Sequence, residues 1–276
     1  MPLKQNTVSV WRSAGLANTL FLHAKYRDHR FQPHFHDEYA IGIIEQGCQA
    51  FSYDAKSRID LAEGTVCLIS PGMVHEGWVG AEEGWTYRMF YPAVDLVEQA
   101  ANDIFGTKEI TFSSPAVHDP ELHRNLQRLH LMTASPYVER LELETTYLST
   151  IRMSVQRHAG GRLKTDTGRH SSGLKQIRDL LEDQYSEGIT LNELKVLSGL
   201  SKFHLLRQFK SVFGLAPHAY LTQVRIRRAS SFIRSGNNLA DTAAAVGFVD
   251  QAHMTNAFRR TLGYTPGLLR KAVLAE

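Results

Sequence analysis

Hydrophobic and polar residues follow different periods in the two halves of this chain. Between residues 31 and 92, short apolar runs alternate with turn signals such as Pro71-Gly72. These runs predict short strands at residues 39–45, 48–53, 65–70 and 85–91. Over residues 119–133 and 138–158 the apolar positions recur every three or four residues, which predicts two helices. We therefore expect an all-β sandwich or barrel with a helical extension.

The second half, from about residue 174, is predicted to be helical throughout. Residues that favour the first turn of a helix recur along it, as N-caps or as a proline at the first helical position. They predict helix starts at Thr190, Ser201, Pro217, Asn238 and Asp250. Residues 161–173 are rich in glycine, threonine, serine and charge and carry no period. We interpret them as a linker between domain 1–160 and domain 174–276, which makes the fold class α+β multidomain.

One pattern is written twice in the helical half. A glycine recurs at an offset of 48, and the following phenylalanine, glycine and proline recur at an offset of 49. The pairs are Gly199 and Gly247, Phe209 and Phe258, Gly214 and Gly263, and Pro217 and Pro266. A duplication of this length indicates two copies of one small helical unit. Because helix, glycine turn, helix is the pattern of a helix-turn-helix, we predict double-stranded DNA as the partner.

The second helix of each copy carries the candidate DNA-binding residues. In the first copy, the stripe opposite the expected core mixes apolar and cationic residues, namely Phe203, Leu206, Arg207 and Lys210. Arginine can pair with guanine, and apolar groups can contact thymine methyl groups. The alternative is that Phe203 and Leu206 belong to a wider core stripe. The second copy offers Gln251, Ala252, His253, Asn256 and Arg259, of which Gln251 and Asn256 suit adenine.

Charge and geometry agree with this interpretation. Residues 1–170 contain 17 Lys/Arg and 20 Asp/Glu, a net charge of −3, whereas residues 171–276 contain 14 and 8, a net charge of +6. A basic C-terminal part fits a polyanion-binding module. The helix between the copies, about eighteen residues, would span roughly 27 Å, enough to hold two reading helices about one DNA turn apart. The arginines 225, 227, 228, 259 and 260 are expected to hold phosphates or remain solvated.

The repeated region is part of a longer pattern that includes Leu205, Arg207, Phe209-Lys210, Phe213-Gly214, Arg225, Gly247-Phe248, Asp250-Gln251, Phe258-Arg259 and Gly263-Tyr264-Thr265-Pro266. On these residues, positions 174–271 resemble the DNA-binding domain of the AraC/XylS family of bacterial transcription regulators. By position, the resemblance implies base-reading sites at Phe203, Leu206 and Arg207, and at Ala252, His253 and Asn256. Several relatives carry arginine where this chain has Asn256, so the second unit is expected to bind less strongly or to read a different base.

Upstream, titratable side chains are concentrated in the segment His34-Phe35-His36-Asp37-Glu38. In a strand, positions 34, 36 and 38 would point to one side, and His75 adds a third imidazole after the turn at Pro71-Gly72. Over residues 20–95 this resembles the two sequence motifs of the cupin barrel. A cupin-like domain often precedes the DNA-binding domain in the AraC family. The expected fold is thus a cupin-like β-barrel with a helical extension, followed by an all-α double helix-turn-helix domain.

Three roles are open for His34, His36 and His75. They can hold a divalent first-row metal ion, for which imidazole is a suitable ligand, with Glu38 as a substitute carboxylate. They can hydrogen-bond loops at the barrel mouth, or they can line an effector cavity together with Glu38. We favour an organic effector, so no cofactor is required and no metal is firmly assigned. Arg88, if it faces the barrel interior, needs a carboxylate from the protein or from an amino or organic acid effector.

These features predict a cytoplasmic, sequence-specific transcription regulator that responds to a small-molecule effector. No catalytic motif stands in a suitable context, so we expect no enzyme. The N-terminus has no signal pattern and no apolar run has the length of a membrane span. RNA polymerase is an expected partner, and a homodimer is expected if the helices at 119–133 and 138–158 form a dimer surface instead of packing on the barrel. Two other functions stay open: a metal-dependent cupin enzyme with a DNA-binding tail, and an effector-independent DNA-binding protein.

Overall fold

The protein is described from a computed structural model, which covers residues 6–16, 19–53, 57–135, 138–160 and 172–274. Contacts between Cα atoms divide the chain into two compact units. The first consists mainly of Met1–Arg30 and Phe35–Thr165, and the second of Asp166–Ala275 with the short segment Phe31–His34. Most of the predicted linker, residues 161–171, lies outside the described residues.

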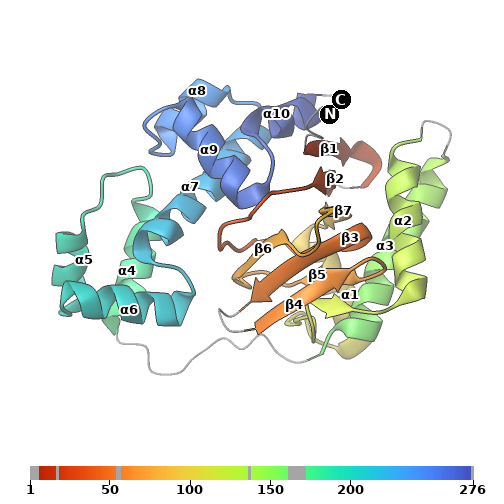
Figure 1. The fold of residues 1–276 in the computed structure, drawn as a ribbon, viewed down its shortest axis with the longest axis horizontal. Helices are drawn as coiled ribbons and strands as arrows, with labels where there is room; N and C mark the ends of the chain where they lie inside the picture. The colour runs from red at the N-terminus through yellow and green to blue at the C-terminus, as the bar shows by residue number, and fades with distance from the viewer. Residues whose placement is uncertain (1–5, 17–18, 54–56, 136–137, 161–171, 275–276) are drawn as a thin grey trace. The chain divides into compact units, whose positions relative to one another are not determined.

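Within the described residues, the first unit contains an eight-stranded antiparallel sheet (Figure 1). Its main path runs β1-β2-β7-β3-β5-β8, and β4 and β6 pair with β3 off this path. The strands are β1 Thr7–Ser13, β2 Thr19–Tyr26, β3 Ala40–Tyr53, β4 Ser57–Ala62, β5 Val66–Ile69, β6 His75–Val79, β7 Trp85–Tyr91 and β8 Ala116–Val117. The predicted β class of this unit is therefore confirmed.

The long strand β3 joins two segments that the sequence predicts as separate strands. Gly47, at the predicted break, has a φ of 74°, and a Cβ there would lie 2.1 Å from the backbone oxygen of Gly84. The register with β7 also shifts between Ile44 and Gln46. The strand thus bends here without ending, so that its first half pairs with β5 and β7 and its second half with β4 and β6.

Three helices pack on one face of this sheet. They are α1 Val94–Phe105, α2 Pro120–Thr133 and α3 Arg140–His158, of which α2 and α3 confirm the predicted pair. Phe21, Ile43 and Phe90 from the strands share a buried cluster with Leu126 and Ile151 from the helices. The inward stripes of α2 and α3 are therefore used in packing on the sheet, which was one of the two alternatives for these helices.

The second unit is helical in all its described elements. These are α4 Ser172–Asp183, α5 Leu191–Ser198, α6 Lys202–Phe213, α7 Pro217–Arg234, α8 Leu239–Ala245, α9 Gln251–Leu262 and α10 Pro266–Leu274. The helix starts follow the predicted signals: Thr190 and Glu193 form a capping box, and Ser201, Asn238 and Asp250 each accept a backbone N–H. Among the helices in the described ranges, none combines the length and apolarity needed to cross a membrane. Both cysteines are free.

Candidate nucleic-acid interface and histidine site

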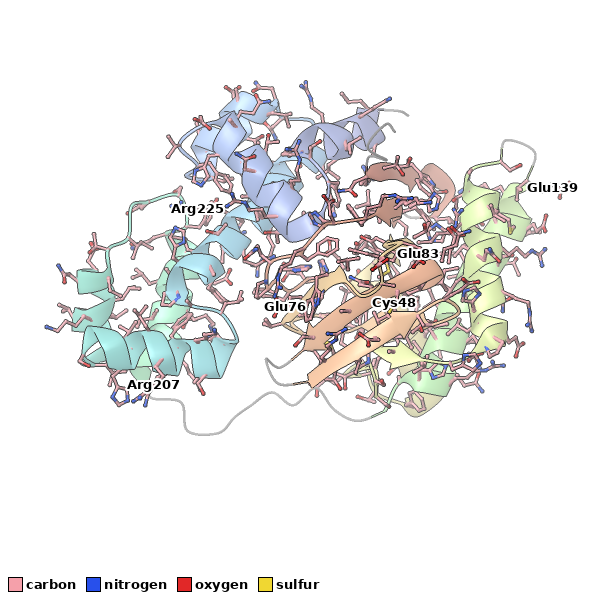
Figure 2. All side chains as sticks on the ribbon, in the orientation of Figure 1. Cys48, Glu76, Glu83, Glu139, Arg207 and Arg225 are labelled. Carbon is pink, nitrogen blue, oxygen red and sulfur yellow. The ribbon has the colours of Figure 1, made fainter. Side chains whose placement is uncertain are left out.

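Helix α6, the second helix of the first copy, keeps its predicted core stripe and exposes the opposite one. It follows the turn at Gly199, where φ is 67°. Leu205 and Phe209 are fully buried, whereas Leu206, Arg207 and Lys210 are exposed. Figure 2 shows Arg207 on the outer side of this helix. Leu206, with 37% exposure, is therefore not a core residue; the side chain of Phe203 lies outside the described residues.

Helix α9 occupies the same place in the second copy. Asp250 caps it by accepting the backbone N–H of His253 at 2.6 Å, and Met254 and Phe258 are fully buried. The outward residues are all exposed, namely Gln251, Ala252, His253, Asn256 and Arg259. The candidates on α9 and the described candidates on α6 are thus free of core packing. They form two surfaces, one cationic and apolar, the other mainly hydrogen-bonding.

The arginines of α7 differ from expectation. Arg225 donates from Nε to the backbone oxygen of Tyr185 at 2.6 Å and from Nη2 to that of Glu187 at 2.9 Å. Arg227 donates from Nη2 to the Glu182 carboxylate at 2.8 Å. Intramolecular acceptors thus hold both guanidinium groups, so neither is simply solvated. Periodicity within α7 could not reveal this, since the acceptors come from α4 and the loop that follows it.

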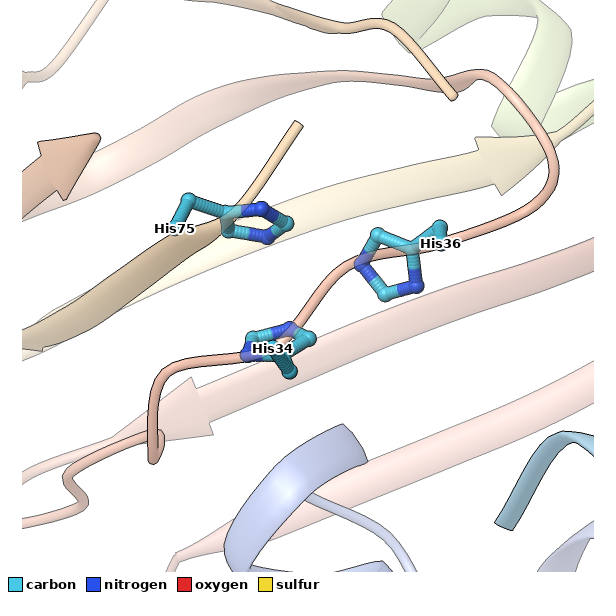
Figure 3. A group of neighbouring side chains, drawn as sticks. All are labelled: His34, His36 and His75. Atoms are coloured by element: carbon cyan, nitrogen blue, oxygen red, sulfur yellow. The ribbon is translucent and has the colours of Figure 1, made fainter. Parts of the chain in front are cut away.

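In the N-terminal part of the chain, His34, His36 and His75 come together (Figure 3). One ring nitrogen from each lies within 4.8 Å of the others. His34 and His75 are buried and His36 is half-buried. Burial lowers the pKa of His75 to about 4, and burial together with the neighbouring His75 lowers the pKa of His36 to about 3. The imidazoles of His36 and His75 are therefore neutral near pH 7.

Two of the three imidazoles are oriented by the backbone. His34 donates from Nδ1 to the oxygen of Gln32 at 2.7 Å, and His75 donates from Nδ1 to the oxygen of Met73 at 2.8 Å. A carbonyl can only accept, so Nδ1 carries the proton in both rings and Nε2 keeps its lone pair. Such a site can ligate a cation or accept hydrogen bonds from a ligand.

Glu38 and Arg88 do not join the histidines. Residues 31–39 form no regular strand, so the alternation that would bring Glu38 to their side does not apply, and Glu38 is not a member of the group. Arg88 pairs in register with His23 and shares a face of β7 with Phe90, which is in the cluster under the helices. Arg88 therefore does not take the interior position considered for an effector-binding arginine, because the pleat points it to the helix-covered face.

On that face, Arg88 has a protein carboxylate as its partner. Its Nε lies 2.6 Å from Glu45 Oε1, and His23 Nε2 lies 2.9 Å from Glu45 Oε2. Burial alone would raise the pKa of Glu45, but the hydrogen bonds from His23 and Arg88 outweigh it and lower the pKa to about 2. Glu45 lies on β3 and His23 on β2, and the pairing of both strands with β7 brings these side chains to Arg88.

The outer side of the helical extension carries exposed leucines. Leu131 of α2 is 55% exposed, and Leu141 and Leu148 of α3 are 74% and 52% exposed. A groove of about 370 Å³ runs beside the first of them. It is lined by Arg124, Gln127, Arg128, Leu131, Met132, Ser135 and Val138. Leu141 and Leu148 belong to the predicted apolar stripe of residues 138–158, so packing on the sheet accounts for only part of that stripe.

Comparison with known proteins covers both units. Residues 17–148 match the AraC-like ligand binding domain, and residues 197–272 match a helix-turn-helix domain. The uncharacterized HTH-type transcriptional regulator YbfI of Bacillus subtilis is 32% identical over 226 residues, which is 82% of this chain and 82% of YbfI. The HTH-type transcriptional activator RhaS of Yersinia pseudotuberculosis is 26% identical over 247 residues, which is 87% of this chain and 89% of RhaS.

A solved structure shares the two-unit fold. ToxT from Vibrio cholerae aligns over 99% of this chain and 100% of its own with a TM-score of 0.54. At 11% identity this is a likeness of fold alone. ToxT has also been solved with an unsaturated fatty acid bound.

Proposed function

Because the chain belongs to the AraC family of DNA-binding transcription regulators, we propose that it reads its operator with α6 and α9 under the control of a small molecule bound within residues 17–148. The proposed DNA-binding residues are Phe203, Leu206, Arg207, Lys210, Gln251, Ala252, His253, Asn256 and Arg259. The observation that carries this assignment is the division of each reading helix, whose buried stripe packs in the core while its described candidates stay exposed.

The spacing between the reading helices supports recognition of two successive major grooves. Helix α7 has 18 residues, and at about 1.5 Å per residue it spans roughly 27 Å. Paired recognition helices on one face of DNA lie about one turn, roughly 34 Å, apart. A footprint with the region upstream of its own gene should protect about two helical turns per monomer. Binding without sequence preference at physiological salt would contradict the proposal.

The proposed effector site is the group of His34, His36 and His75. The Nε2 lone pairs of His34 and His75 can accept hydrogen bonds from a hydroxyl or amino group of an organic ligand. Arg88 is not part of this site, since its guanidinium binds Glu45 on the helix-covered face. The preference for an amino or organic acid rested on Arg88, so the site supports a polar organic molecule without requiring a carboxylate. Thermal-shift screening of metabolites, repeated on His75→Gln, tests this assignment.

A divalent metal ion is the second candidate for the same site. Metal-ligating histidines usually donate their other ring N–H to a carbonyl or carboxylate, as His34 and His75 do here. Metal–nitrogen distances of about 2.1 Å draw ligands to roughly 3.5 Å from each other. The three nitrogens, within 4.8 Å, would close by about 1 Å on such an ion. The ion would serve as a ligand of the sensor, held by His34, His36 and His75.

Cobalt titration tests this second candidate without relying on DNA binding. Purified protein without a histidine tag should bind one Co²⁺ and develop d–d absorption in the visible region. His75→Gln should abolish the absorption, while His218→Gln, which removes an exposed histidine of α7, should retain it. If wild-type protein binds no Co²⁺ at micromolar concentrations, the metal assignment fails and the organic effector stands alone.

The remaining assignments concern partners and location. We propose a homodimer formed through the exposed leucines of α2 and α3, because apolar residues at a surface favour association. Leu141→Glu should then shift the mass measured by light scattering toward the monomer. RNA polymerase is the proposed protein partner, the cytoplasm the proposed location, and no catalytic activity is assigned.

A further inference from the structure

The loop between α4 and α5, residues 185–187, touches parts of the second unit that are far apart in sequence. Arg225, in the middle of α7, binds the backbone oxygens of Tyr185 and Glu187 at 2.6 and 2.9 Å. The guanidinium carbon of Arg228, one turn further along, lies 5.1 Å from the centre of the Tyr185 ring. The loop that leads into the first helix-turn-helix is therefore tied to the helix that connects the two copies.

The same loop also contacts the turn of the second copy. Gly247 separates α8 from α9, and a Cβ there would lie 2.7 Å from the backbone oxygen and 2.8 Å from the Cα of Ser186. Such distances are far below van der Waals contact, so only glycine allows the approach. Ser186 lies between the two residues whose carbonyls Arg225 holds. We call residues 185–187, Arg225, Arg228 and Gly247 the joint.

The joint gives the two helix-turn-helix copies a second connection. Along the chain they are linked only by α7, and each copy could pivot at an end of that helix. Glu182 already holds α4 to α7, since its carboxylate accepts from Tyr220 and Arg227, each at 2.8 Å. Arg225 extends this attachment to the loop, and Gly247 attaches the second copy to the loop. The loop is thereby attached both to α7 and to the second copy, so the two copies are connected through the loop as well as through α7.

We propose that Arg225 is a positioning residue that sets the separation of α6 and α9, and with it the one operator spacing that both helices can read together. This rests on the proposed DNA-binding function. Arg225 holds its two carbonyls by charge-assisted hydrogen bonds, which are stronger than neutral ones. A rigid arrangement makes binding of the second copy effectively intramolecular once the first is bound. A loosened joint loses that advantage while each reading surface stays intact.

The test compares full and half operators in the full-length chain. Wild-type protein first selects its operator from a random DNA pool. Affinity is then measured for the full site, for a probe in which one half is scrambled, and for full sites with one or two base pairs added or removed between the halves. The variants are Arg225→Ala, Arg225→Lys and Gly247→Ala. Arg234→Ala, an exposed arginine of the same helix outside the joint, and Gly199→Ala serve as matched controls.

Arg225→Ala should weaken full-site binding about tenfold or more, because the effective concentration of the second copy falls. Half-site binding should stay within about threefold, and the preference for one spacing should flatten. Arg225→Lys, with one point charge in place of the fork, should restore part of the loss. Gly247→Ala, which disturbs the contact between the joint and the second copy, should also weaken the preference for one spacing. The two control variants, Arg234→Ala and Gly199→Ala, should keep that preference.

Equal losses of affinity on full and half sites would mean that Arg225 has only a structural role, and would overturn the proposal. An unchanged spacing preference in both Arg225→Ala and Gly247→Ala would also overturn it. If Arg225→Ala fails to fold by circular dichroism, Arg225→Lys and Gly247→Ala decide by the same criterion. Wild-type protein that selects no operator would instead refute the DNA-binding function itself. The two failures are therefore distinguishable.

Discussion

Gly199 and Gly247 hold the same place in the two helix-turn-helix copies, with φ angles of 67° and 85°. Outside the chain neighbours of Gly199, no described heavy atom lies within 4 Å of the position that a Cβ would take, whereas Gly247 meets the backbone of Ser186 at 2.7 Å. The first glycine is thus required by backbone conformation alone, and the second also by packing. The duplicated turns therefore differ in packing, because the turn of the second copy also contacts the loop that leads into the first.

The reading helices differ in a related way. Helix α6 exposes Leu206 beside Arg207 and Lys210, while α9 exposes Gln251 and Asn256 together with Arg259. Cationic side chains contribute phosphate attraction and bidentate guanine recognition, whereas amides discriminate by hydrogen bonds to adenine. We therefore expect phosphate attraction from both copies and recognition of adenine from the second.

The largest expected difference between the two copies is the stability lost when each turn glycine is replaced by alanine. Gly247→Ala should lower the free energy of unfolding by about 3 kcal/mol or more, because positive-φ strain adds to overpacking against Ser186. Gly199→Ala should cost only about 1 kcal/mol, the strain alone. Urea denaturation of both variants measures the two losses. Equal losses would mean that the contact with Ser186 has no energetic weight, and the comparison would fail.

The reading residues should show a smaller difference. Arg207→Ala is expected to weaken operator binding by about 2 kcal/mol, and Asn256→Ala by about 1 kcal/mol, within the range for direct base contacts. Each variant should also relax the preference at its own base pair, which affinity measurements on singly substituted operators would detect. Lys210→Ala is a useful control: its loss should be uniform across sequences and should reduce the salt slope by about one. A uniform loss for Arg207→Ala would assign it to phosphates.

The smallest expected difference is the stability lost when the N-cap of each reading helix is removed. Asp250 accepts the His253 N–H at 2.6 Å, and Ser201 accepts the His204 N–H at 3.4 Å. We expect Asp250→Ala to cost about 1.5 kcal/mol of unfolding free energy and Ser201→Ala about 0.5 kcal/mol, the upper and lower parts of the range for N-caps. Thermal unfolding of the two variants measures the difference. A larger loss for Ser201→Ala would reverse the expected order.

Much of the second unit could be predicted because its signals are local. Thr190, Ser201 and Asp250 each cap their own helix through the residue three positions later, so both partners lie close together in the sequence. The buried stripes of α6 and α9 follow from a period of 3.6 residues. In the first unit the turn signal at Gly47 was read as a break, since sequence does not distinguish a bent strand from two strands.

The sequence by itself determined the helices of the second unit, the duplication of the helix-turn-helix, and most of the residues that the reading helices expose. These features depend on neighbours along one helix. Only the tertiary structure decided that His75 meets His34 and His36, that Arg88 turns to Glu45, and that Arg225 holds the loop before α5. The physical reason is the sequence separation between the interacting residues. Strand pairing and helix packing bring together groups dozens of residues apart, and alternation alone offers two faces without stating which one the helices cover.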